Sequence, residues 1–457
     1  MIAIAYTLSF CFLGVQMIRW LMPKKSPPVR AWLGVSLGVL MEMCLPALCA
    51  NLLDFTFAAA LLLAAVCYAA REKAPLCAMR ETDRRQLAVM AAVGIPLTAL
   101  SAYLQYTHCI MPASDGSLWC GQSTYGDLCM HLSFITSLEN MSFPPAYNLL
   151  AGTALSYPYL TDALSTTFYM LGMPLNLSLV VPGTLLMALT YAGYMLLAQQ
   201  LLGGRHKAVA VAALLFFLNG GLGFLYDFDL AFTDNFARIR EIFTGYYRTP
   251  ANQPDLNLRF SNVIADLMIP QRALLGGWAM GIPALYLLIS SVREKSYRQT
   301  ALLALWAAAL PLVHTHTFLA LALFSGGYLL GSLIEHREDR CGILLRAGLY
   351  LAVVLARYVT GSASAMGSRN EIDLDNKYIV IDTSGMPDDL LLPGIFWATD
   401  IANDLISGAG GQLSALISDE LWSLVGANSN PLAAGYIQEM VKTIRGLGGI
   451  AITSTQG

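Results

Sequence analysis

An acid and an imidazole lie four residues apart in a long polar segment, at Asp127 and His131. Residues at this spacing share one face of a helix, so the carboxylate and the imidazole can converge on one substrate. Carboxylates and imidazoles are the usual general bases of enzymes. The alternative interpretation is an ordered loop in which Asp127 caps a helix or is solvated.

A second acid, Asp162, follows the segment Tyr157-Pro158-Tyr159-Leu160-Thr161. Proline restricts the residue before it to extended backbone, so Tyr157-Pro158 predicts a bend ahead of a short helix. Such a bend is suited to a segment that re-enters at the membrane surface. Asp162 is an alternative catalytic acid, and Tyr157 is a candidate substrate contact.

A third polar group lies immediately before an apolar run and contains Asn262, Asp266, Gln271 and Arg272. An arginine at the mouth of a membrane helix can bind a phosphate through two parallel hydrogen bonds. The alternative is an arginine that reaches lipid headgroups without a specific ligand. Gln271 beside Arg272 favours a polar binding site.

Two imidazoles, His314 and His316, lie at the tip between two apolar runs and are candidate substrate contacts. The alternative is a simple turn between two helices. The His-x-His pair has no third ligand nearby, and the nine cysteines form no CxxC pair. The sequence therefore does not predict a zinc site.

The elements that must position these residues are membrane helices. Hydrophobic residues make up 56% of the chain and charged residues 12%, and the mean hydropathy is +0.56. These values exclude an ordinary soluble protein. Apolar runs near the ~20 residues of a membrane span predict about ten crossings, at Ile2–Leu21, Trp32–Leu52, Phe55–Ala70, Leu87–Tyr106, Leu177–Leu201, Ala208–Phe228, Ala273–Val292, Ala301–Leu312, Phe318–Ile334 and Ile343–Ala356.

The positions of cations predict the orientation of these spans. No Lys or Arg occurs between Arg85 and Arg205, and short loops rich in Lys and Arg stay cytoplasmic. The cationic clusters share one side only if the short piece Ala163–Met173 does not cross the membrane. Three segments then lie outside together, at residues 107–176, 229–272 and 314–316.

These features together resemble the C superfamily (GT-C) of bacterial membrane glycosyltransferases over residues 1–357. The resemblance is carried by Asp127 and His131 in an outer loop, Tyr157-Pro158, Asn219-Gly220-Gly221-Leu222-Gly223, Pro270-Gln271-Arg272 and Leu312-Val313-His314-Thr315-His316. It implies a multi-pass protein of the bacterial cytoplasmic membrane with its active face outside. Such enzymes take a sugar from a polyprenyl-phosphate donor and pass it to a glycan, lipid or protein acceptor, commonly with inversion.

The resemblance also implies roles for the polar residues. In such enzymes an acid in the first large outer loop activates the acceptor hydroxyl or holds a divalent metal, and Asp127 is the matching position. Asp127 would be the base and Arg272 the partner of the departing lipid phosphate. His131 and Gln271 would orient the substrate or share the proton. In many members of the superfamily the acidic loop follows the first span, whereas here four spans precede it.

The chain changes character after Arg357. The composition of residues 358–369 is typical of a flexible linker. In residues 370–457, strand-like and helix-like patterns alternate. Asp419 and Glu420 follow an apolar strand, as the magnesium-binding acids of a Walker B element do. The alternative is an acid pair that only aids solubility.

The ordered segments Asn376–Asp382, Asp419–Trp422, Val441–Gly449 and Ser454-Thr455-Gln456 resemble the C-terminal part of a conjugative type IV secretion motor ATPase. The resemblance implies an incomplete RecA-like α/β fragment with a vestigial nucleotide site at Asp419, Glu420 and Gln456. No GxxxxGK[ST] phosphate loop occurs, so ATP hydrolysis is not expected. Because the two pieces are unrelated, the sequence favours an accidental fusion, a truncated gene or an assembly join over a two-domain enzyme.

Three function classes follow from the sequence. They are a membrane glycosyltransferase, a fragment of a DNA-transfer ATPase, and a membrane transporter or scaffold without catalysis. No nucleic-acid partner is expected for residues 1–357. A transporter predicts ionisable residues within the spans, which are costly there and mark a pathway.

Overall fold

The computed structural model describes residues 1–52, 54–71, 79–121, 125–138, 145–148, 155, 157–220, 262–356, 379, 397–403, 405–406, 414–418, 441–444 and 449–453. The chain divides into two compact units, Met1–Leu355 and Ala356–Gly457. This division lies beside the expected end of the membrane part at residue 357.

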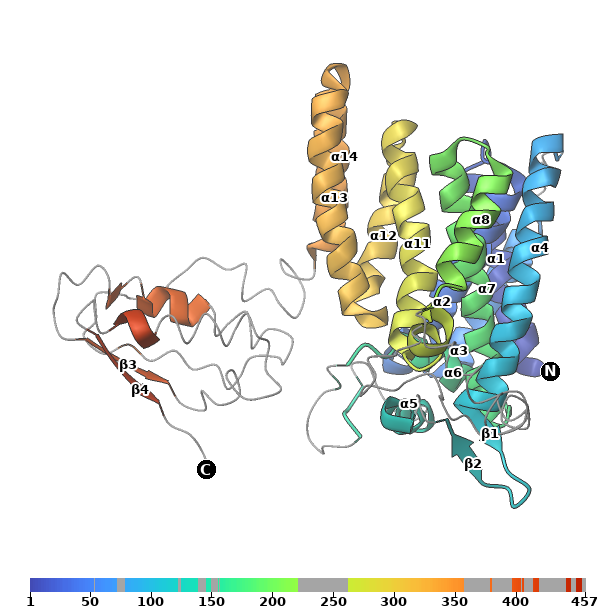
Figure 1. The fold of residues 1–457 in the computed structure, drawn as a ribbon, viewed down its shortest axis with the longest axis horizontal. Coiled ribbons are helices and arrows are strands. Elements are labelled where there is room, and N and C mark those ends of the chain that lie inside the picture. The colour runs from blue at the N-terminus through green and yellow to red at the C-terminus, as the bar shows by residue number, and fades with distance from the viewer. Residues whose placement is uncertain are drawn as a thin grey trace, which may run out of the picture. The chain divides into compact units, whose positions relative to one another are not determined.

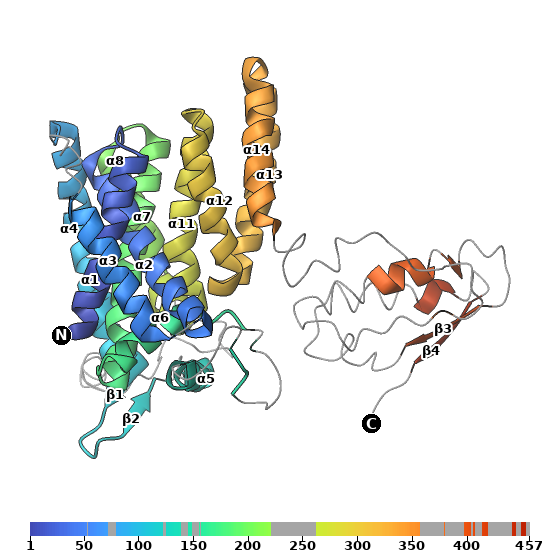
Figure 2. The ribbon, with the colours of Figure 1, turned by 180° about the vertical axis from the view of Figure 1, so that it is seen from behind.

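The first unit is a bundle of helices (Figures 1 and 2). Six helices in the described part of the chain are long and apolar enough to cross a membrane. They are α1 (Ile2–Leu21), α2 (Pro27–Leu52), α4 (Glu81–Leu104), α7 (Leu175–Leu202), α11 (Arg272–Arg293) and α13 (Thr315–Glu335). Their length and composition support a helical membrane protein.

Four shorter helices occupy the remaining predicted spans. They are α3 (Phe55–Arg71), α8 (His206–Phe217), α12 (Tyr297–Val313) and α14 (Arg340–Val354). The expected count of about ten crossings is therefore larger than the six helices that meet the length of a span. The four shorter helices are 12 to 17 residues long, so the count of about ten crossings stays a prediction.

The turns that carry the cations contact one another at one end of the bundle. Lys25, after α1, forms an ion pair with Glu294 after α11. Arg293 donates to the carbonyl oxygen of Gln200 near the end of α7 at 3.3 Å. Lys295 lies 3.7 Å from Asp339, in the turn η6 (Arg337–Asp339) between α13 and α14. These contacts hold the cationic turns together at one end of the bundle, in agreement with the prediction that they share one side.

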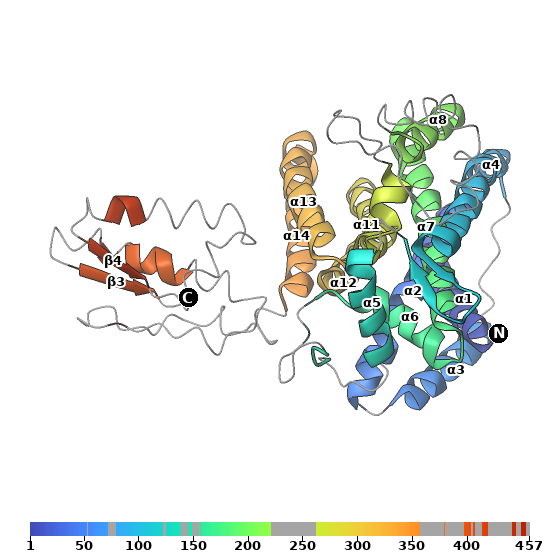
Figure 3. The ribbon, with the colours of Figure 1, turned by 60° about the horizontal axis from the view of Figure 1, so that its bottom comes forward.

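The other end of the bundle carries the predicted polar segments (Figures 1 and 3). It contains the hairpin of β1 (Ile110–Pro112) and β2 (Leu118–Cys120), the helices α5 (Tyr125–Ser137) and α6 (Leu160–Met170), and the π-helical turns η1 (Gln105–Cys109) and η5 (Val263–Met268). The strands pair antiparallel with Ile110 opposite Cys120. At 11 residues, α6 is too short to cross a membrane, as the orientation argument requires.

The second unit is described over short segments only. Strands β3 (Ser414–Ser418) and β4 (Gly449–Thr453) pair in parallel, with Ser414 opposite Gly449. Residues 397–403 and 441–444 are helical. The predicted alternation of strands and helices is visible in these segments, but they do not show a RecA-like sheet.

Candidate functional site

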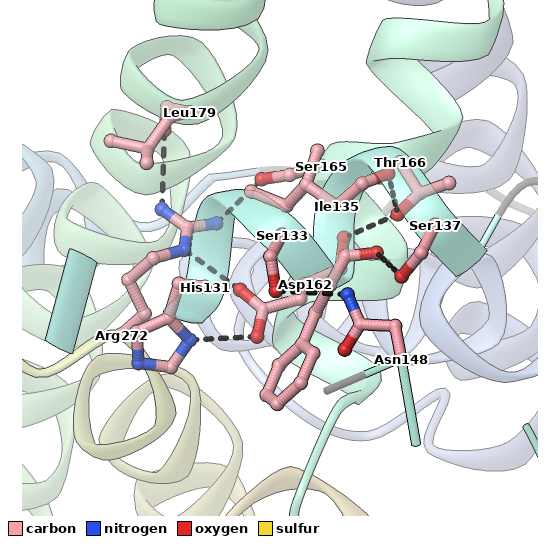
Figure 4. Close-up of polar contacts among 11 residues, drawn as sticks. His131, Ser133, Ile135, Ser137, Asn148, Asp162, Ser165, Thr166, Leu179 and Arg272 are labelled. Carbon is pink, nitrogen blue, oxygen red and sulfur yellow. Dashed lines mark hydrogen bonds and ion pairs between the residues drawn. The ribbon is translucent and has the colours of Figure 1, made fainter. Parts of the chain in front are cut away.

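A buried polar network joins α5, α6 and the first turn of α11 (Figure 4). His131 Nδ1 lies 2.7 Å from Asp162 Oδ2, and Arg272 Nε donates to Asp162 Oδ1 at 3.0 Å. His131 and Asp162 are each 1% exposed and Arg272 is 2% exposed. The structure thus brings together three residues that are widely separated in the sequence.

Each end of the Arg272 guanidinium also has a protein partner. Nη2 donates to the hydroxyl of Ser165 on α6, and Nη1 lies 3.5 Å from the carbonyl oxygen of Leu179 on α7. These contacts satisfy a charge that would otherwise be costly to bury. The guanidinium is thus engaged by protein groups, and the predicted contact of Arg272 with a phosphate stays a prediction.

The network fixes the tautomer of His131. Paired with Arg272, the Asp162 carboxylate is ionised and can only accept hydrogen bonds. His131 Nδ1 therefore carries the proton of this hydrogen bond and donates it to Asp162. Asp162 lies in the first turn of α6, where the helix dipole also favours a negative charge.

Asp127 lies one helical turn before His131 on α5, and its side chain is exposed. The predicted helix is thus formed, but His131 is buried and Asp127 is exposed, so the convergence of the two side chains on one substrate stays a prediction. Tyr157 packs with its ring 5.6 Å from that of His131, at an interplanar angle of 72°. Burial, together with the negative charges of Asp162 and Asp127, raises the pKa of Tyr157 to about 12, so its phenol stays neutral.

Asn262 and Asp266 have structural contacts at η5. Asn262 Oδ1 accepts hydrogen bonds from the backbone nitrogens of Ile264 and Ala265 at 2.8 and 3.2 Å. Asp266 Oδ2 accepts from the backbone nitrogen of Asn262 at 2.6 Å. This reciprocal cap explains both residues without a ligand, and their contact with substrate stays a prediction. Gln271, the residue before α11, is exposed.

His314 and His316 flank the start of α13, and their rings lie 5.3 Å apart. His314 is partly buried, and its Nδ1 lies 2.8 Å from the hydroxyl of Thr317. Burial lowers the pKa of His314 to about 4, with a further contribution from His316. His314 is therefore neutral at physiological pH, whereas His316 is exposed.

Two glycines in α11 let this helix pack closely against both α6, which carries Asp162, and the turn that carries His314. A Cβ built on Gly276 would lie 2.0 Å from Thr161 Oγ1, and one built on Gly277 would lie 2.6 Å from His314 Cβ. Only glycine permits this approach of α11 to α6 and to the turn before α13. These glycines and Ser165 were not predicted from the sequence; the available signal for the glycines was the pair Gly276-Gly277, which begins one helical turn after Arg272.

The predicted nucleotide residues Asp419, Glu420 and Gln456 lie outside the described residues. Strand β3 ends at Ser418, the residue before Asp419. Within the described ranges, no group of three or more His, Cys, Asp or Glu side chains is arranged to hold a metal ion. The divalent metal that the resemblance implies at Asp127 stays a prediction.

No family model matches this chain, and neither curated proteins nor solved structures give a significant match.

Proposed function

We propose that the first unit is a membrane glycosyltransferase that moves a sugar from a polyprenyl-phosphate donor to an acceptor at the membrane surface. The observation that carries the proposal is the buried network of His131, Asp162 and Arg272, with the exposed Asp127 one helical turn before His131 on α5. Ionisable groups gathered in this way on interfacial helices suit acid–base chemistry.

In this proposal Asp127 is the general base for the acceptor hydroxyl, because its exposed carboxylate can reach a substrate. His131 lies one turn away, and its orientation is fixed by Asp162. Arg272 acts as a positioning residue, since its guanidinium holds Asp162. Attack of the acceptor oxygen on the face opposite the lipid phosphate would invert the sugar configuration.

The departing phosphate needs donors or positive charge as the glycosidic bond breaks. Gln271 and His316 are exposed at the same end of the bundle as Asp127, and we assign this contact to them. No step in the proposal passes through a metal.

The cationic turns support an assignment of the side of the membrane that the site faces. Lys25, Arg293 and Lys295 lie at the end of the bundle opposite α5 and α6, and cation-rich turns stay in the cytoplasm. We therefore assign the site to the outer face of the bacterial cytoplasmic membrane, where lipid-linked sugars meet glycan, lipid or protein acceptors.

The test is transfer of a labelled sugar from polyprenyl phosphate by membranes that contain the protein. Asp127→Asn should lower the rate by about 10²–10⁴-fold, the usual contribution of a general base. Asp115→Asn is the matched control, because Asp115 is also an exposed acid at this end but belongs to the β1–β2 turn. Full activity of Asp127→Asn at normal protein level would contradict the proposal.

A transporter is a second candidate, and one residue favours it. Glu42 is an acid within the span α2, where a transporter is expected to carry an ionisable residue. Uptake of protons by proteoliposomes, followed with an enclosed pH dye, would support this candidate if Glu42→Gln abolished it.

A further inference from the structure

Glu42 is completely buried, at 0% exposure, between α1 and α2. It lies at the sixteenth position of the 26-residue helix α2, far from either end. Gly34 and Gly38 precede it by two turns and one turn, so the three residues share the face of α2 that meets α1. An acid at this depth is costly and calls for a specific explanation.

The two helices are in backbone contact along this face. A Cβ built on Gly38 would lie 2.4 Å from the carbonyl oxygen of Phe10, and one built on Gly34 would lie 2.4 Å from Val15 Cα. Such contact is typical of small residues at membrane helix interfaces. Glu42 therefore continues a tightly packed seam.

Hydrogen-bond stoichiometry at Thr7 indicates the protonation state of Glu42. The Thr7 hydroxyl lies 2.8 Å from Glu42 Oε1 and 3.2 Å from the carbonyl oxygen of Ala3. A hydroxyl has only one proton, and the carbonyl of Ala3 can only accept. Both contacts are good hydrogen bonds if Glu42 is protonated, because Glu42 then donates to Thr7 and Thr7 donates to Ala3.

The surroundings also disfavour an ionised carboxylate. The second oxygen, Oε2, is buried without a hydrogen-bond partner, as is the hydroxyl of Tyr6. In the part of the chain that the structure describes, Glu42 has no ion pair. Tyr6 and Cys11 of α1 are titratable groups that interact electrostatically with it, and neither can carry a positive charge. A lone carboxylate in such a site would neutralise itself by binding a proton.

We infer that Glu42 is a proton-binding site within the membrane-spanning part, where it remains a neutral carboxylic acid at physiological pH. The acid donates to Thr7 and thereby ties α2 to α1. This site is separate from the proposed catalytic network, and the inference does not depend on the glycosyltransferase proposal.

The first test uses dicyclohexylcarbodiimide, a lipid-soluble reagent that reacts with protonated carboxyl groups. The acid proton moves to a carbodiimide nitrogen while the carboxylate oxygen adds to the central carbon. The acyl group then migrates to nitrogen, and a stable N-acylurea forms without a leaving group. Mass spectrometry of the protein in membranes at neutral pH should find this adduct on Glu42, and Glu42→Gln should lose it.

The matched control is Glu335, an exposed acid at the end of α13. Glu335→Gln should leave the labelling unchanged. Labelling that persists undiminished in Glu42→Gln would contradict the inference.

An infrared measurement decides the case if the reagent does not reach the seam. The carbonyl stretch of a protonated carboxyl group should be present in the wild-type spectrum at neutral pH and absent from that of Glu42→Gln. If the two spectra show the same protonated-carboxyl band, Glu42 is ionised and the inference is wrong. Glutamine has nearly the same shape and can also donate to Thr7, so we expect this variant to fold.

Discussion

Arg272 donates from Nε to Asp162 Oδ1 at 3.0 Å, and both side chains are almost completely buried. The contact joins α11 to α6 across 110 residues of sequence. It anchors the interfacial helix α6 to the bundle, and His131 on α5 depends on the same carboxylate.

Removal of Arg272 should strongly destabilise the membrane unit. Arg272→Met leaves Asp162 as a buried charge without a cation, and breaking such a pair costs about 3–5 kcal/mol. Thermal unfolding in detergent should therefore show a lower Tm. The double variant Arg272→Met/Asp162→Leu should recover part of the loss, because it removes both charges.

Arg85 supplies the control for this experiment. Its pair with Glu81 is exposed at both residues, at 3.2 Å, and exposed pairs contribute little. Arg85→Met should leave Tm nearly unchanged. Equal effects of Arg85→Met and Arg272→Met would contradict a special role for the buried pair.

Gly276 should not tolerate alanine. A Cβ there would lie 2.0 Å from Thr161 Oγ1, and overpacking of this kind costs about 1–3 kcal/mol. Because the nearest atoms all belong to the Thr161 side chain, Thr161→Ala should restore part of the stability in the double variant. Unfolding in detergent measures both effects.

Gly327 on α13 is the matched glycine, because a Cβ built there meets nothing within 4 Å. Gly327→Ala should be neutral or stabilising by about 0.5–1 kcal/mol, since alanine favours a helix. The interpretation of close packing at Gly276 fails if both alanine variants behave alike.

The positions of the helices could be predicted from the sequence because apolar runs bounded by cations leave few alternatives. Every predicted run contains a helix in its described part, and Arg357 lies close to the end of the first unit. Six of the predicted runs give helices that meet the length of a span, and the other four give shorter helices, because hydropathy does not show where a helix begins or ends. Residues 221–261 of the outer connection lie outside the described part.

The site could be predicted only in part. The spacing of Asp127 and His131 identified the right helix, and Asp162 and Arg272 were both selected as functional candidates. Their mutual contact was not foreseen, because a pairing across 110 residues leaves no periodic trace in the sequence. Glu42 was missed since one acid scarcely changes the hydropathy of a long apolar run.

A fall in pH should destabilise the protein, in part through protonation of His314. Its pKa is lowered to about 4 from the usual 6.5, so the folded state resists a proton that the unfolded chain accepts. The stability that the neutral imidazole provides is thus present above about pH 6.5 and is lost as the pH falls toward 4. The fall in Tm between pH 7 and pH 5 should be smaller in His314→Gln than in the wild type.

His336 provides a comparison, because it is a partly exposed histidine at the end of α13, 4.0 Å from Glu338. His336→Gln should keep the wild-type fall in Tm. An identical acid response of all three proteins would show that His314 does not contribute.

Tyr157 should report the charge of Asp127. Its pKa is raised to about 12 by burial, by Asp162 and by Asp127, so Asp127→Asn should lower it while Asp115→Asn should not. Carbon-13 NMR of labelled tyrosine, assigned with Tyr157→Phe, follows the titration. The raised pKa also means that the stability that the neutral phenol provides is present below about pH 10 and is lost as the pH rises toward 12. If Asp127→Asn left the titration of Tyr157 unchanged, the two side chains would not share the site on which the proposed reaction depends.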